Sequence, residues 1–168
     1  MLSESARMSS ASEARFRVQA ANSTPRAIKV IAMDAPSVNV VKELAERSWH
    51  HAMFFTAATI SGATSGGSPS AWLTDVLGGG TADLIDEVDC ADLVIMVASP
   101  GGHANRASLI GEACSHRRVM TTALVVSAGS SSDEDLAKTL AQLRPWSLMV
   151  VIANADDYVE DILTALRA

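Results

Sequence analysis

The residues with the clearest capacity for chemistry form a glycine-containing stretch in the middle of the chain. Gly101 and Gly102 follow a long apolar run, and His103, Asn105 and Arg106 come directly after them. Glycine lets backbone N–H groups approach an oxyanion closely, while the amide and guanidinium side chains offer further donors at the start of a helix. The pattern predicts an anion or nucleotide site at a strand–turn–helix junction. A tight turn that simply requires glycine is the alternative.

Three more polar residues stand near predicted strand ends. Asp34 follows the first apolar run, where it could accept a phosphoryl group, hold a metal or cap the next helix. Capping is favoured because no second acid adjoins it. Ser37 is a possible N-cap of that helix, and Ser99 ends the apolar run before the glycines. His103 could serve as a general base near neutral pH, although a solvent-exposed turn histidine is the commoner case. No metal site is expected, because the histidines and cysteines lack ligand spacing.

Five apolar runs predict strands, and the segments between them predict helices. The predicted strands are 27–33, 53–58, 93–98, 120–127 and 148–153, and the predicted helices are 37–49, 72–77, 81–88, 104–116, 133–143 and 156–168. Strands that alternate with helices pair in parallel through right-handed crossovers. We therefore expect an α/β fold, a three-layer, doubly wound Rossmann-like domain with a mostly parallel five-stranded sheet. The pattern permits two strand orders, 3-2-1-4-5 and 2-1-3-4-5.

The N-terminal segment 1–26 differs in composition from the rest of the chain. It is rich in Ser, Ala and Arg, and it is predicted to be an N-terminal extension that precedes the α/β domain at 27–168. Within it Ala14, Phe16, Val18 and Ala20 alternate with polar residues, which is the period-two pattern of a half-exposed strand. The extension could therefore add an edge strand to the sheet or contact a neighbouring subunit.

The bulk composition argues against several classes of partner. The net charge of −6 disfavours nucleic acid and anionic membrane surfaces, which attract clustered Lys and Arg. No apolar run approaches the ~20 residues of a membrane-spanning helix. Cys90 and Cys114 are isolated and no secretory signal precedes them, which predicts structural thiols in a cytoplasmic protein. The methionines expected in the core, because they fall in predicted strands, are Met33, Met96, Met120 and Met149.

Four segments, in order, resemble the loops and strands of the nucleotide-binding domain of the FtsZ/tubulin family. Residues 28–39 (I-K-V-I-A-M-D-A-P-S-V-N) are similar to the family's I-K-V-I-G-V-G-G-A-G-G-N, and 65–69 (S-G-G-S-P) to its A-G-G-D-P. Residues 92–102 (D-L-V-I-M-V-A-S-P-G-G) are similar to its D-M-V-F-V-T-A-G-M-G-G. The pair 143–144 followed by 148–156 is similar to its E-L-R and L-I-V-I-P-N-D. The resemblance covers about residues 27–158.

The resemblance implies a ligand and adds site residues. It implies that GTP, GDP or another nucleotide binds at the carboxyl ends of the first and third predicted strands. By position, it implies that Asn39 lies near the phosphates, that Gly66 and Gly67 belong to the second loop, and that Asn154 lies near the base. It also favours the strand order 3-2-1-4-5.

The chain departs from the family at its glycine loops. Residues 34–38 replace the first loop, and only Gly101 and Gly102 remain of the family's G-G-G-T-G-T-G. Side chains in such loops narrow a phosphate cradle, and the Asp34 carboxylate would repel a polyphosphate. The sequence also ends where the family's second domain, which triggers hydrolysis in the next subunit, would begin. We therefore expect GTP hydrolysis to be lost.

These observations predict a degenerate FtsZ/tubulin-like domain that binds a nucleotide or another phosphorylated small molecule. The N-terminal extension and the head-to-tail assembly of the family predict a homo-oligomer. Two alternatives stay open. One is a non-catalytic, self-associating interaction module that has lost the pocket. The other is an enzyme of a different class that uses Asp34, His103 and Arg106 on a small substrate.

Overall fold

The centre of the fold is a pair of buried parallel strands, β1 (Ile28–Ala32) and β5 (Leu93–Ala98). Both consist almost entirely of aliphatic residues, which suits strands covered by helices on both faces. The computed structural model describes residues 25–57, 72–126, 131–153, 157–166 and 168.

Five further strands extend the sheet on either side of this pair. They are β2 (Ala52–Thr56), β3 (Trp72–Asp75), β4 (Thr81–Asp83), β6 (Met120–Val125) and β7 (Met149–Ile152). The order across the sheet is β4-β3-β2-β1-β5-β6-β7. β3 and β4 form an antiparallel hairpin at one edge, and the other strands are parallel.

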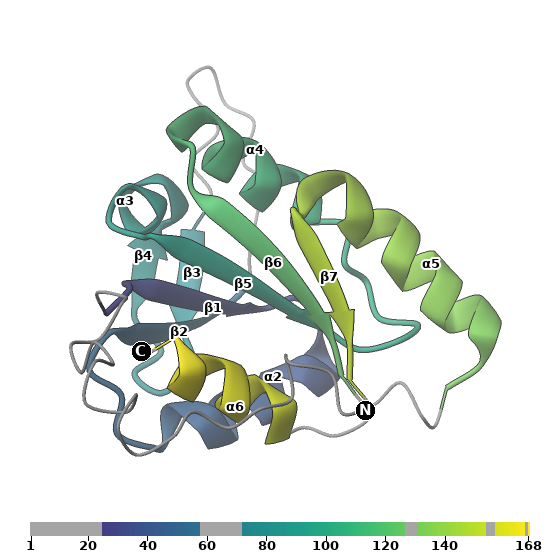
Figure 1. Ribbon diagram of the computed structural model, residues 1–168, viewed down its shortest axis with the longest axis horizontal. Helices are drawn as coiled ribbons and strands as arrows, with labels where there is room; N and C mark the ends of the chain where they lie inside the picture. Colours follow the sequence, from purple (N-terminus) through teal and green to yellow (C-terminus); the bar gives the residue numbers. More distant parts are fainter. Residues whose placement is uncertain (1–24, 58–71, 127–130, 154–156, 167) are drawn as a thin grey trace, which may run out of the picture.

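Helices cover both faces of the sheet (Figure 1). One face carries α2 (Ala35–Ala45) and α6 (Asp157–Ala165). The other face carries α3 (Leu84–Asp89), α4 (Ala107–Arg117) and α5 (Asp133–Leu143). The short 3-10 helix η3 (Arg144–Trp146) follows α5. Each helix layer buries an apolar stripe against the sheet, so two cores form. The three-layer α/β fold with helices on both faces is confirmed, and it is consistent with a Rossmann-like domain.

The sheet differs from the prediction in strand count and in strand order. It has seven strands rather than five. Counted along the chain, the five predicted strands lie in the order 2-1-3-4-5, so the order 3-2-1-4-5 is wrong. The chain leaves β2 through the hairpin at the outer edge and returns on the α3 side to place β5 beside β1. The two strands whose residues are all buried, β1 and β5, thereby lie side by side in the middle of the sheet, where both faces are covered.

The hairpin replaces a predicted helix. Trp72, Leu73, Val76 and Leu77 have a spacing that also fits a helix, but residues 72–75 pair with β2 and residues 75–80 form the turn. The Asp75 carboxylate accepts hydrogen bonds from the backbone N–H groups at positions 77 and 78, and glycine with positive φ follows at position 79. The predicted helix 81–88 likewise starts later, at Leu84, because residues 81–83 form β4. Sheet pairing overrides the local helical spacing here.

Other helix boundaries shift by a few residues. α2 ends at Ala45 rather than 49, and α4 begins at Ala107 rather than 104, because the residues after Gly102 still belong to the turn. α5 begins and ends as predicted, with Ser132 as N-cap and three acids in its first turn. None of the helices in the described ranges is both long and apolar enough to cross a membrane.

Two of the four methionines expected in the core are not buried there. Met33 and Met96 are buried, whereas Met120 and Met149 are 40% and 52% exposed. These two are the first residues of β6 and β7, at the amino ends of the strands, where they are only partly covered, so the core prediction is wrong for them. The predicted N-terminal edge strand at 14–20 lies outside the described residues.

Candidate functional site

The sheet has a topological switch point between β1 and β5. The chain leaves β1 for α2 on one face of the sheet and leaves β5 for α4 on the other face (Figure 1). In open α/β sheets, ligands usually bind where two neighbouring strands diverge in this way. A cavity of about 680 Å³ lies there, at the carboxyl ends of both strands. We call it the switch-point cavity. The predicted site residues that line it are Asp34, Gly101, Gly102, His103, Asn105 and Arg106.

Asp34 lies at the edge of this cavity and joins the two loops. Its Oδ1 accepts a hydrogen bond from the Ser37 backbone N–H at 2.9 Å, and its Oδ2 accepts one from the Ser99 N–H at 2.7 Å. The Ser37 hydroxyl in turn accepts a bond from the Asp34 N–H at 3.2 Å, which completes a capping box. The favoured capping role is therefore confirmed, although Asp34 and not Ser37 is the N-cap. The carboxylate is almost wholly buried and is used structurally.

Gly102 packs directly against this carboxylate. A Cβ at this position would overlap the Asp34 Oδ2, and it would lie 2.7 Å from the Asp34 Cγ and 2.9 Å from the Ser99 carbonyl oxygen. The Gly102 N–H also donates to that carbonyl oxygen at 3.0 Å. The glycine therefore has a packing reason of its own, and its N–H is bound within the turn.

Helix α5 supplies acceptors for two further N–H groups of the turn. Gly101, with a φ of 76°, donates to the Thr139 Oγ1 at 3.0 Å and to the Asp135 carbonyl oxygen at 3.3 Å. The Ala104 N–H donates to the Gln142 Oε1 at 2.8 Å. A phosphate-binding glycine loop would aim such N–H groups at the ligand. In this chain three of them are bound to the protein itself.

The mouth of the cavity carries donors that are not used in this way. His103 and Asn105 are exposed, and Arg106 is half-buried. Arg106 is the N-cap of α4. Its guanidinium has no acceptor with which to cap the helix, and within the described residues it belongs to no ion pair. A guanidinium beside a helix N-terminus is a favourable place for an anion.

The remaining predicted site residues fall into three groups. Ser37 and Ser99 are buried behind the cavity, where they hold Asp34. Asn39 is exposed in the second turn of α2 and does not line the cavity. Gly66, Gly67 and Asn154 lie outside the described residues.

The sequence interpretation missed the residues of α5 that hold the glycine turn. Asp135, Thr139 and Gln142 belong to a helix that begins only after β6, far along the chain from the turn, and Thr139 is fully buried. A signal existed in their spacing, because positions i, i+4 and i+7 share one face of a helix. The apolar residues that complete the cavity wall were also missed. They are Met33, Ala35, Pro36 and Pro100.

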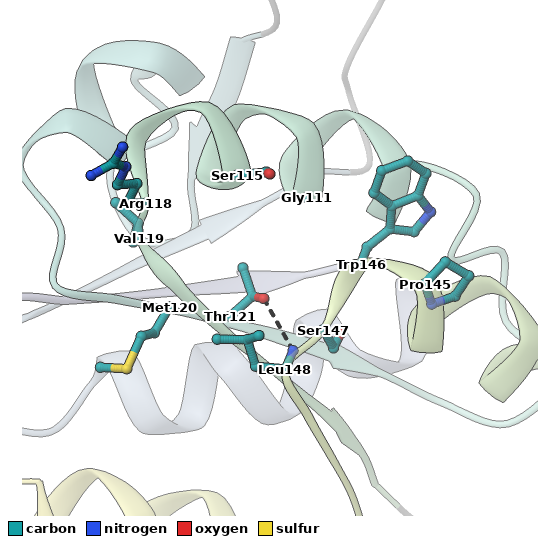
Figure 2. Close-up of a pocket in the computed structure, with 10 residues that line it drawn as sticks. All are labelled: Gly111, Ser115, Arg118, Val119, Met120, Thr121, Pro145, Trp146, Ser147 and Leu148. Atoms are coloured by element: carbon teal, nitrogen blue, oxygen red, sulfur yellow. Dashed lines mark hydrogen bonds between the residues drawn. The ribbon is translucent and has the colours of Figure 1, made fainter.

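A second hollow, of about 370 Å³, lies against the amino ends of β6 and β7 (Figure 2). Trp146 packs on Gly111, where an added Cβ would lie 2.5 Å from the Trp146 Cβ. Figure 2 shows Arg118 and Trp146 on opposite sides of the hollow, with the Leu148 N–H donating to the Thr121 Oγ1 at 3.4 Å. The polar groups do not converge on one point, so the hollow lacks the arrangement of a small-molecule site.

The two cysteines differ in environment. Cys114 is buried in α4, and burial raises the pKa of its thiol to about 12. Cys90 is exposed at the end of α3, so a packing role fits Cys114 only. Within the described ranges, no three His, Cys, Asp or Glu side chains are grouped so as to hold a metal ion.

Comparisons with protein-family models and with curated proteins give no match to this chain. The resemblance to the FtsZ/tubulin family therefore stays a prediction, and so does the homo-oligomer that it implies.

Proposed function

We propose that the chain binds a nucleotide or another phosphorylated small molecule in the switch-point cavity, as a degenerate FtsZ/tubulin-like domain that does not hydrolyse it efficiently. The observation that carries the proposal is the position of Arg106. Its guanidinium, without an ion-pair partner among the described residues, lies at the start of α4 and at the wall of a cavity of about 680 Å³. A cavity of this size at the carboxyl ends of parallel strands is the usual ligand site of such folds.

The proposed binding mode differs from that of a glycine-loop protein. The N–H groups of Gly101, Gly102 and Ala104 are bound to the protein, and the Asp34 carboxylate occupies the space beside Gly102. A phosphate would therefore be held at the mouth by the side chains of Arg106 and its neighbours, away from the Asp34 charge. The apolar cavity wall would contact the rest of the ligand. Efficient hydrolysis is not proposed, because both oxygens of Asp34 already accept backbone hydrogen bonds.

Thermal unfolding with GTP, GDP, ATP and inorganic phosphate tests this proposal. A ligand at about 100 times its Kd adds about 2.7 kcal/mol to the free energy of unfolding, which raises the Tm by roughly 5–10 °C for a domain of this size. Arg106→Gln should remove most of that shift. Arg144→Gln is the matched control, because Arg144 is exposed in η3 and outside the cavity lining.

Each outcome has a distinct meaning. A shift with guanine nucleotides alone supports the family resemblance, whereas a shift with every phosphate supports a general anion site at Arg106. No shift with any of the four, or an equal shift in Arg106→Gln and the parent chain, contradicts the proposal. The non-catalytic interaction module would then be the better hypothesis.

A further inference from the structure

In the part of the chain that the structure describes, the outer edge of β7 is apolar and is not paired with another strand. Among the described strands β7 pairs with β6 alone, and it ends the sheet. Leu148 is 79% exposed, Met149 52% and Ile152 47%. No charged residue or proline occurs from 148 to 153. Exposed edge strands usually carry charges or prolines, or are covered by another segment, because an open apolar edge invites pairing with other chains. We call this surface the β7 edge.

An apolar groove adjoins the β7 edge on the α6 side of the sheet. Its volume is about 250 Å³, and Met149, Ile162 and Leu166 contribute to its walls. Arg26 lines the same groove. Because Arg26 is the second residue of the first described range, the covalent connection to the preceding residues starts beside this groove.

The length of that preceding segment is sufficient to reach the β7 edge. A strand added outside β7 would lie four strand spacings from β1, or about 19 Å. The extended chain from position 20 to position 26 spans about 20 Å. Since the connection starts at the amino ends of the parallel strands, the added strand would run antiparallel to β7.

The sequence of the segment matches such a position. In 14–20, Ala14, Phe16, Val18 and Ala20 alternate with Arg15, Arg17 and Gln19, so an extended conformation would separate an apolar face from a polar one. Segment 1–24 contains three arginines and two glutamates and is therefore net positive, whereas the whole chain has a net charge of −6. This difference in sign favours docking of the segment onto the domain.

We propose that residues 14–20 cover the β7 edge as an antiparallel strand, with Phe16 and Val18 over the apolar groove. The segment thereby pairs with the outward-pointing N–H and C=O groups of β7, the last strand of its own sheet. This inference is independent of the ligand site, which lies at the carboxyl ends of β1 and β5.

Hydrogen–deuterium exchange on the full chain tests the proposal. The amides of Met149–Ile152 that point away from β6 should be protected in the parent chain. In the double variant Phe16→Asp/Val18→Asp they should exchange at least about tenfold faster, because local opening no longer has to displace the segment. Gln19→Asp/Ser23→Asp introduces the same charge away from the apolar face and should exchange like the parent. The amides of β1 and β5 report on the folded state of each variant.

Three results would overturn the assignment. One is rapid exchange of Met149–Ile152 in the parent chain, and another is protection that is unchanged in Phe16→Asp/Val18→Asp. The third is protection that rises with protein concentration together with a doubled mass by light scattering, which would assign the β7 edge to a second copy of the chain.

Discussion

Replacing Asp34 with alanine should destabilise the fold by more than the loss of an ordinary helix cap. The change removes the N-cap of α2, which is worth about 1 kcal/mol. It also leaves the Ser99 N–H without the acceptor that now lies at 2.7 Å, and an unsatisfied buried donor costs about 1–3 kcal/mol. The sum is about 3 kcal/mol, which lowers the Tm by roughly 6–12 °C. The reason is that one carboxylate holds together the loops after β1 and β5.

Equilibrium urea unfolding measures this loss, with Asp83→Ala as the matched control. Asp83 caps α3 through a single hydrogen bond from the Ile85 N–H at 2.8 Å and does not join two loops. Asp83→Ala should therefore cost only about 1 kcal/mol. Asp34→Asn should recover little, because its single carbonyl oxygen can serve one donor while its NH₂ group faces the other. Equal losses in Asp34→Ala and Asp83→Ala would refute the structural role assigned to Asp34.

Two further predictions concern close packing and thiol chemistry. Gly102→Ala should lower the free energy of unfolding by about 2–3 kcal/mol in urea, because the new Cβ overlaps the Asp34 carboxylate. In an Asp34→Ala background the loss caused by Gly102→Ala should be smaller. Additive losses of the two substitutions would contradict the contact. A disulfide reagent should label Cys90 quickly and Cys114 only on unfolding. Since burial raises the pKa of Cys114 from 9.0 to about 12, its contribution to stability is fully present below pH 9 and is lost as the pH rises toward 12. Fast labelling of both thiols in the native protein would contradict that burial.

The layer architecture could be predicted because its cause is local. Aliphatic runs such as 28–32 and 93–98 can be stable only when both faces of the strand are covered, and the helical segments between the runs supply that cover. The hairpin at 72–83 could not be predicted in the same way. Its apolar residues fit a helix as well as a strand, and only the free edge of β2 decides between the two.

The position of the candidate site also followed from the sequence. Glycines and polar residues after two buried strands meet at one edge of a parallel sheet, and Asp34 and Gly102 are in contact there although they are far apart in the chain. The hydrogen bonding of the glycine turn could not be predicted from the sequence. The sequence suggested a glycine turn with free N–H groups, and nothing in it indicated that α5 would supply acceptors for them.

The α/β class, the capping of α2 by an acid and the edge of the sheet where the loops meet could all be predicted from the sequence. These features depend on residues near one another in the chain and on the period of strands and helices. The strand order, the hydrogen bonding of the glycine turn to Thr139 and Gln142, and the position of β7 at the end of the described sheet became evident in the tertiary structure alone. Those features depend on contacts between segments far apart in the sequence, where the energy comes from packing and hydrogen bonds that no local pattern records.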